Sequence, residues 1–191
     1  MAEPLEDAVE SDDKKVALII AILALFLALA EAGAKNAEHR STEQNIESSD
    51  LFNFYQAKKV RSTIAETAAQ AFEAERAASS DPKAQEAFDK QIGEWKAVVA
   101  KFEKDPKKPE DSMDAIQERA LAAAEGRELS NRKLEHFEYA SGALQIAIVL
   151  ASAAIITGVT VLAWFAAGLG LIGAALMAFG YFAPTVLGFL G

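Results

Sequence analysis

The stretch VALIIAILALFLALAEAGA, residues 16–34, decides the fold because it is apolar throughout except for Glu31. The hydrocarbon core of a bilayer is about 30 Å thick, and roughly 20 apolar residues of helix cross it. The stretch has this length and directly follows two basic residues, Lys14 and Lys15. It therefore predicts a transmembrane helix over residues 14–34.

A cleaved signal peptide is the alternative for this stretch, because the apolar run follows two lysines and contains a run of alanines ahead of Lys35. The preceding residues, MAEPLEDAVESDD, are acidic rather than basic, and the apolar run is longer than a usual signal core. Both features favour an uncleaved anchor. Residues 1–13 are then expected to form an acidic flexible tail.

The C-terminal part of the chain has the composition of a second membrane region. From Tyr139 to Gly191 it contains no Lys, Arg, Asp or Glu, and it is long enough for two spans and a turn. We place the spans at 139–157 and 161–182, the turn at TGVT (157–160) and an apolar tail at 183–191. Small residues recur at every fourth position and predict close helix packing in both spans: Ala143, Ala147 and Ala151, and Ala166, Gly170, Ala174 and Ala178.

The charged residues 35–138 between these membrane regions predict a helical extramembrane arm. No Gly or Pro occurs between Lys35 and Asp81, so the first helix is expected to continue to about Ser79. Its weakest point is SSD at 48–50, whose side chains can hydrogen-bond their own backbone.

Local signals divide the rest of the arm into two helices. Asp81 followed by Pro82 predicts a helix start, and this second helix runs to about Lys104. The segment DPKKPED, 105–111, is expected to break the arm because its two prolines are incompatible with helix. A third helix starts near Ser112 and enters the apolar region at Tyr139.

The fold class expected is all-α, with three transmembrane helices, one N-terminal and two in a C-terminal hairpin, and a long antiparallel arm. One helix leads out and two consecutive helices lead back; a break at the serines would give a shorter bundle instead. Apolar residues at spacings of three and four predict packing stripes on the first two helices of the arm: Phe54, Ala57, Val60, Ile64, Ala68 and Ala71, and Ala84, Phe88, Ile92, Trp95, Val99 and Phe102.

Glu31 and Gln145 form a possible intramembrane polar site. A carboxylate at the bilayer centre costs about 3 kcal/mol and would indicate an ion or proton site. Glu31, however, comes sixteen residues after Lys15, roughly 24 Å along a helix, so we expect an interfacial residue or a partner of Lys35. An ion or proton role is the alternative. Gln145 is expected to hydrogen-bond across helices.

No feature indicates an enzyme or a cofactor. The chain has two histidines, His39 and His136, which would lie near the membrane on neighbouring helices, but the Glu-x-x-His pair of di-metal bundles is absent. We interpret them as solvated residues, with no metal. Phosphate-binding glycine loops and nucleophile elbows are also absent, and a chain without cysteine has no thiolate chemistry.

The expected partners are the lipid bilayer and either a second copy of the chain or another membrane protein. A net charge of −9 disfavours both nucleic acid and anionic lipid as partners of the extramembrane part as a whole, because both would be repelled. The block LFNFYQAKKVRS, 51–62, does combine aromatic with basic residues, a composition that can bind nucleic acid. In an acidic chain, helix packing with a solvated charged face explains this pattern better.

The chain resembles a bacterial family of small membrane proteins, the domain of unknown function family 4337. The likeness rests on the basic pair, the span ending AEAGAKNAE, the block SSDLFNFYQAKKVR and the segment LQIAIVLASAAIIT, and it covers nearly the whole chain. The resemblance implies an uncharacterised three-span membrane protein and brings no reaction, cofactor or functional residue. We expect this protein to lie in the bacterial inner membrane. Relatives place several basic residues in the hairpin turn, and TGVT has none.

The orientation signals oppose each other. Lys14 and Lys15 favour a cytoplasmic N-terminus and hence a periplasmic arm. Five basic residues flank the arm side, but the arm is longer than the loops to which the positive-inside count applies: Lys35, Arg40, Arg127, Arg132 and Lys133. We expect an exported arm.

The function expected is that of a membrane-anchored helical scaffold or self-associating subunit of a larger membrane complex. Long amphipathic helices without a catalytic constellation favour this interpretation. An accessory subunit of an ion or proton transport system is the alternative, and a metal-dependent enzyme using His39 and His136 is the third hypothesis.

Overall fold

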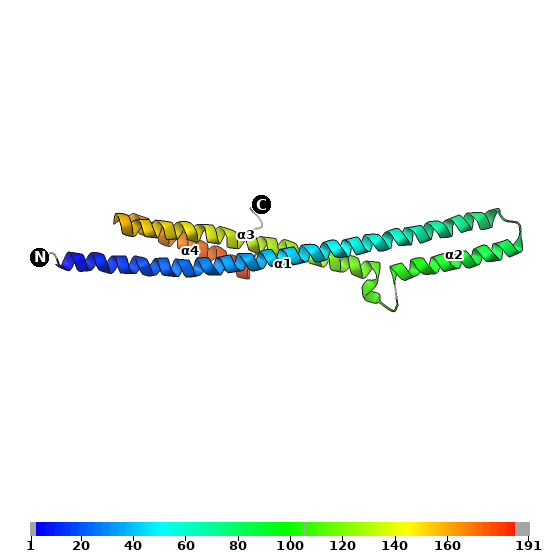
Figure 1. Cartoon of the computed structure of the whole chain (residues 1–191), viewed down its shortest axis with the longest axis horizontal. Helices are drawn as coiled ribbons and strands as arrows, with labels where there is room; N and C mark the ends of the chain where they lie inside the picture. Colours follow the sequence, from blue (N-terminus) through cyan, green and yellow to red (C-terminus); the bar gives the residue numbers. More distant parts are fainter. Residues whose placement is uncertain (1–2, 105, 186–191) are drawn as a thin grey trace. The chain divides into compact units, whose positions relative to one another are not determined.

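The structure, a computed structural model, describes residues 3–104 and 106–185 of the 191-residue chain. These residues are almost entirely helical and contain no strand (Figure 1). The elements in chain order are α1 (Glu3–Ala78), α2 (Pro82–Glu103), the short 3₁₀ helix η1 (Pro109–Asp111), α3 (Met113–Thr157) and α4 (Thr160–Phe182). The predicted all-α class is confirmed.

Three of these helices are long and apolar enough to cross a membrane. Within the described residues they are Lys14–Ala78, Met113–Thr157 and Thr160–Phe182. Each predicted span lies inside one of them, so the sequence identified the membrane-compatible helices correctly.

The helix ends follow the local chemistry. The side chain of Asp81 accepts a hydrogen bond from the backbone N–H of Lys83 at 3.0 Å, and Pro82 opens α2. Gly158 follows α3 with φ +69°, a left-handed conformation that glycine adopts without steric cost. The predicted helix start and the predicted turn are both confirmed.

The described chain falls into two compact units. Unit 1 contains the residues up to Thr42 and those from Arg127 onward, and unit 2 is Glu43–Gly126. Because α1 and α3 each contribute one segment to both units, each unit is described separately below.

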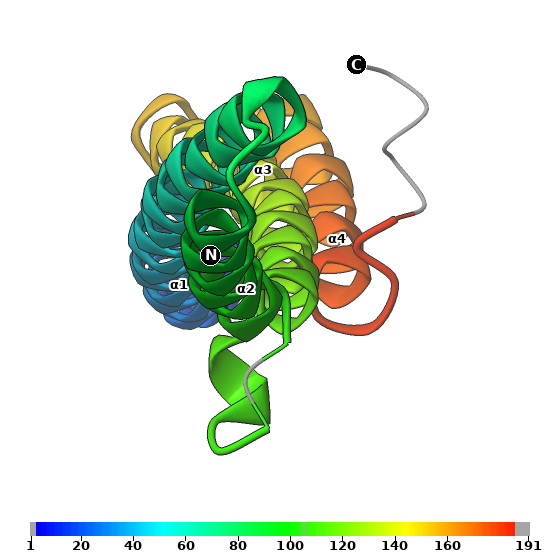
Figure 2. The same ribbon diagram turned by 90° about the vertical axis from the view of Figure 1, so that its right-hand side faces the viewer.

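In unit 1, the first part of α1, the second part of α3 and all of α4 lie side by side (Figures 1 and 2). Glycines let α4 approach its neighbours. A Cβ atom on Gly173 would lie 2.7 Å from Leu144 Cγ and 3.2 Å from the Ala140 carbonyl oxygen. The buried core beside them is made of small and medium side chains, as is typical of helix packing in membranes: Leu23, Ala30, Ala140, Leu144 and Ala147.

The predicted small-residue stripe on α4 is half right. Ala166 and Gly170 are buried, Ala174 is half-buried and Ala178 is exposed. The buried face continues through Gly173 and Gly180 instead. A helix has 3.6 residues per turn, so a spacing of four drifts by about 40° per step and leaves the contact. On α3, Ala147 and Ala151 are buried and Ala143 is half-buried.

The outer surface of unit 1 carries large apolar side chains on all three helices. Leu25, Val149 and Phe165 are each more than 60% exposed. A helix that is apolar on its outer as well as its inner face is typical of a membrane span.

In unit 2, the chain returns along α1 in the antiparallel sense. Near one end of the unit, Arg76 forms an ion pair with Asp89, and the ring of Phe72 contacts the ring of Phe88. Near the other end, the hydroxyl of Ser48 donates a hydrogen bond to the carbonyl oxygen of Ala120. From Arg76–Asp89 through the ion pair of Glu73 with Lys96 to Ser48–Ala120, the partner number rises as the α1 number falls. This order indicates an antiparallel return through α2, η1 and the start of α3. Between these pairs, the Lys58 amine donates to the carbonyl of Asp111.

The expected weak point at SSD, 48–50, is wrong, because α1 is continuous through it. The hydroxyl of Ser48 is buried and donates to the Ala120 carbonyl oxygen on α3 at 3.1 Å. It therefore ties two helices together instead of competing for the backbone of its own helix.

The predicted core stripe on α1 is also wrong within this chain. Phe54 and Ile64 are 45% and 61% exposed, while Ser62, Ala65 and Ala69 are buried. Small side chains occupy the contact because they let the helices approach closely, and the larger apolar residues stay outside.

On α2 the predicted stripe lies at the contact. Ile92 is buried, Phe88 and Trp95 are half-buried, and the ring of Phe88 lies 6.2 Å from that of Phe72.

Candidate functional site

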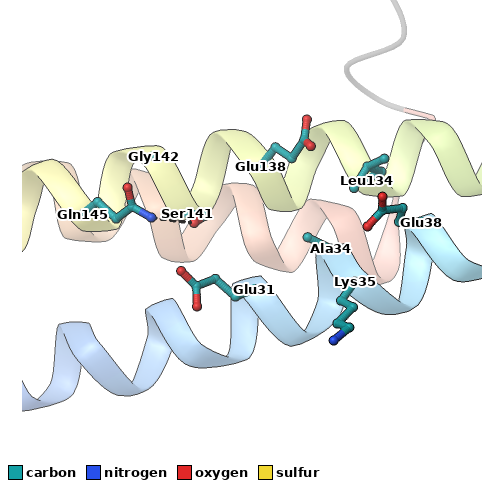
Figure 3. A pocket seen from close by; sticks show the side chains of 9 residues that line it. All are labelled: Glu31, Ala34, Lys35, Glu38, Leu134, Glu138, Ser141, Gly142 and Gln145. Carbon is teal, nitrogen blue, oxygen red and sulfur yellow. Dashed lines mark hydrogen bonds between the residues drawn. The ribbon is translucent and has the colours of Figure 1, made fainter.

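The two polar residues singled out in the apolar segments, Glu31 and Gln145, line one cleft of unit 1. This cleft has a volume of about 440 Å³ and lies between α1 and α3 (Figure 3). The sequence predicts these two residues as a possible intramembrane polar site because each is polar within an apolar segment, but it does not predict the register that brings them to one cleft. The rest of the lining comes from the same two helices: Ala34, Lys35, Glu38, Leu134, Glu138, Ser141 and Gly142.

Glu31 points from α1 toward the face of α3 that carries Gln145 and Ser141 (Figure 3). The amide of Gln145 donates to the Ser141 hydroxyl at 3.4 Å. This bond lies within α3, so the structure does not show the interhelical hydrogen bond that was predicted. Glu31 is exposed, and its predicted place at the water interface stays a prediction.

The charge of this cleft is negative. Glu31 and Glu38 point their carboxylates toward α3, whereas the lining residues Lys35 and Glu138 point away from the facing helix (Figure 3). Among the described residues, Glu31 and Lys35 do not form an ion pair with each other, so the predicted pairing of Glu31 with Lys35 is absent. A cleft of this charge attracts cations in general.

The histidines have different environments. His39 is exposed, as expected, but His136 is 3% exposed, so its predicted solvation is wrong. Its Nε2 lies 3.2 Å from the Pro184 carbonyl oxygen. A carbonyl only accepts, so Nε2 carries the proton in this hydrogen bond. Among the described residues, no group of three His, Asp or Glu side chains could hold a metal ion.

A second cleft of unit 1, which the sequence reasoning missed, has the opposite charge. It has a volume of about 350 Å³ and is lined by Arg40 of α1, Lys133 of α3 and Tyr181 of α4. In the sequence these two cations indicate only the membrane topology. The sequence does contain a signal for this cleft. Arg40 and Lys133 each lie six residues outside a predicted span, and two antiparallel helices bring such positions to the same level.

A family model described as "Domain of unknown function (DUF4337)" matches residues 12–183. The match includes both clefts, unit 2 and all three membrane-compatible helices, and it leaves out only the two ends of unit 1. No curated protein and no solved structure matches the chain.

Proposed function

The chain belongs to the domain of unknown function family 4337, whose description assigns no activity, and from its residues we propose a membrane-anchored helical protein that self-associates through α1. Unit 1 is the anchor, spanning the membrane three times, with α3 and α4 as its C-terminal hairpin. Unit 2 is the extramembrane arm. The membrane is the bacterial inner membrane, with the arm on the periplasmic side.

The observation that carries this proposal is a second apolar face on α1 of unit 2. One face is buried against α2 and α3. The other, which we call the exposed seam, is unpartnered, and Val60 and Ile64 on it are 58% and 61% exposed. The seam consists of exposed residues at alternating spacings of four and three: Asn53, Ala57, Val60, Ile64, Thr67 and Ala71.

A second copy of this chain fits the seam. Spacings that alternate between four and three repeat every seven residues, the pattern by which two helices pack along a common seam. One edge of the seam is neutral at every seventh residue, so identical chains meet there without charge repulsion: Ser49, Gln56, Thr63 and Gln70. The other edge carries Glu47 and Arg61, which have opposite signs.

Anchoring favours this contact because it holds all copies in one membrane with one orientation. Copies then meet with α1 parallel, and part of the rotational and translational cost of association is already met. Asn53 in the seam sets the register between the two copies, because an asparagine there pairs best with the same asparagine of the other copy.

The test is the mass of the full chain in detergent by light scattering, with Val60→Glu/Ile64→Glu as the seam variant. Burying each side chain contributes about 1.5 kcal/mol or more, so we expect wild type to form an oligomer and the variant to be monomeric. The matched control is Val98→Glu/Leu121→Glu, which adds the same charges at exposed apolar residues of unit 2 outside the seam. A monomeric wild type, or a seam variant that assembles normally, would contradict the proposal.

A second candidate function, an accessory subunit of an ion or proton transport system, is favoured by one observation. Glu31 and Gln145 converge on one negatively charged cleft near the end of the first apolar segment. In this role Glu31 accepts the cation or proton from the water side.

Cation and proton flux into liposomes tests this second function. We expect Glu31→Gln to reduce flux to near the rate of protein-free liposomes, because the group that receives the cation is lost. Glu135→Gln removes the same charge from an exposed position of α3 outside the cleft and serves as the control. Equal flux in wild type and Glu31→Gln would exclude the role.

A further inference from the structure

We infer that the cleft between Arg40, Lys133 and Tyr181 binds the phosphate of an anionic lipid headgroup. The two cations come from antiparallel helices and lie at the same level, because the neighbouring residues Ser41 and Asn131 are joined by a hydrogen bond of 2.5 Å. Within the described residues, neither cation belongs to an ion pair and no Asp or Glu lines the cleft. The cleft thus presents two positive charges without a countercharge.

The cleft lies at headgroup depth. Arg40 is six residues past Ala34 and Lys133 is six residues before Tyr139, so each is about 9 Å along its helix from the apolar segment. The headgroup layer extends roughly 5 to 8 Å beyond the hydrocarbon on each side. Long basic side chains reach back toward the membrane over such a distance, so both can meet a phosphate there.

The wall of the cleft is fixed by close packing. The ring of Phe137 stacks edge-on against Tyr181 at 5.1 Å. A Cβ on Gly33 would lie 2.8 Å from that ring, and a Cβ on Gly180 would lie 3.3 Å from it. These glycines leave room for the ring, and the ring gives the cleft a firm apolar wall. Asn36 and Ser130 add neutral polar groups to the lining.

Exposed aromatic side chains beside the cleft can contact the acyl chains of the lipid. Tyr181 is 58% exposed and its neighbour Phe182 is 89% exposed, and tyrosine favours the membrane interface. The C-terminal end of α4 bears about half a negative charge, which the two cations outweigh. Basic pockets between membrane helices are recognised binding sites for anionic headgroups.

The test measures lipid bound to the purified full chain by native mass spectrometry, after exchange into nanodiscs of phosphatidylcholine with or without phosphatidylglycerol. We expect wild type to retain phosphatidylglycerol selectively. The neutral variant Arg40→Gln/Lys133→Gln should lose about fivefold in affinity per cation, on the order of 30-fold together. Equal retention by wild type and this variant would overturn the inference.

Two further variants separate the site from general charge and from folding. Lys35→Gln/Arg132→Gln removes two positive charges from the same two helices outside this cleft and should retain the lipid. Arg40→Lys/Lys133→Arg keeps both charges and should also retain it. Loss of lipid in either variant would contradict a phosphate held by these two cations.

Inorganic phosphate distinguishes the two sources of the anion. If the ligand is a lipid, its acyl chains hold it beside Phe182 and added phosphate should leave its retention unchanged. Displacement of the lipid by inorganic phosphate, or equal binding of phosphate without any lipid preference, would assign the cleft to a free anion and overturn the lipid assignment.

Discussion

Replacing Gly173 by leucine is expected to destabilise unit 1 by about 3 kcal/mol, the upper end of the usual cost of overpacking a core. The first added carbon would already lie 2.7 Å from Leu144 Cγ and 3.2 Å from a backbone oxygen of Ala140. The backbone oxygen cannot rotate away, so α3 and α4 must separate. Separation would expose the alanine contacts on which the packing of these helices depends.

Gly168→Leu is the matched control because Gly168 lies on the same helix and a Cβ there meets no atom within 4 Å. This substitution should leave stability unchanged or raise it by about 0.8 kcal/mol, since leucine is the better helix former. Thermal unfolding in mild detergent, followed by circular dichroism, compares the two variants. Equal midpoints for Gly173→Leu and Gly168→Leu would show that α3 and α4 do not pack as described.

Features set by local chemistry were predictable from the sequence. The start of α2 at Asp81 and Pro82 depends on one capping side chain and one ring. The turn at Gly158 depends on a conformation that glycine favours. Helix length, apolar length and these end signals therefore predicted the elements and their order.

The choice of the buried face on α1 was not predictable by the same reasoning. That helix has two apolar faces, and hydrophobicity ranked Phe54 and Ile64 above Ala65 and Ala69. The structure buries the alanines, because close approach along a whole helix depends on small side chains more than on the most apolar ones. The size of the side chains at the contact therefore decides the buried face together with their polarity.

The clefts were only partly predictable because they depend on the register between helices. Glu31 and Gln145 could be found singly, as polar residues in apolar segments. Their meeting in one cleft depends on the antiparallel alignment of α1 with α3, and so does the meeting of Arg40 with Lys133. The alignment between two helices cannot be predicted when each segment is considered separately.

In the proposed topology three helices cross the membrane, and the arm and the hairpin turn lie on opposite sides of it. The chain contains no cysteine, so a single introduced cysteine is its only thiol. Ser80→Cys marks the turn between α1 and α2, Val159→Cys marks the turn between α3 and α4, and Ala24→Cys marks an exposed position inside the first apolar segment.

Labelling these three variants with a membrane-impermeant maleimide in intact cells and after lysis is the most direct test. With an exported arm, Ser80→Cys should react in intact cells, Val159→Cys only after lysis, and Ala24→Cys only after detergent is added. Exchanged sides for the first two would reverse the orientation and keep three spans. Reaction of Ser80→Cys and Val159→Cys from the same side, or of Ala24→Cys in intact membranes, would contradict the three-span account.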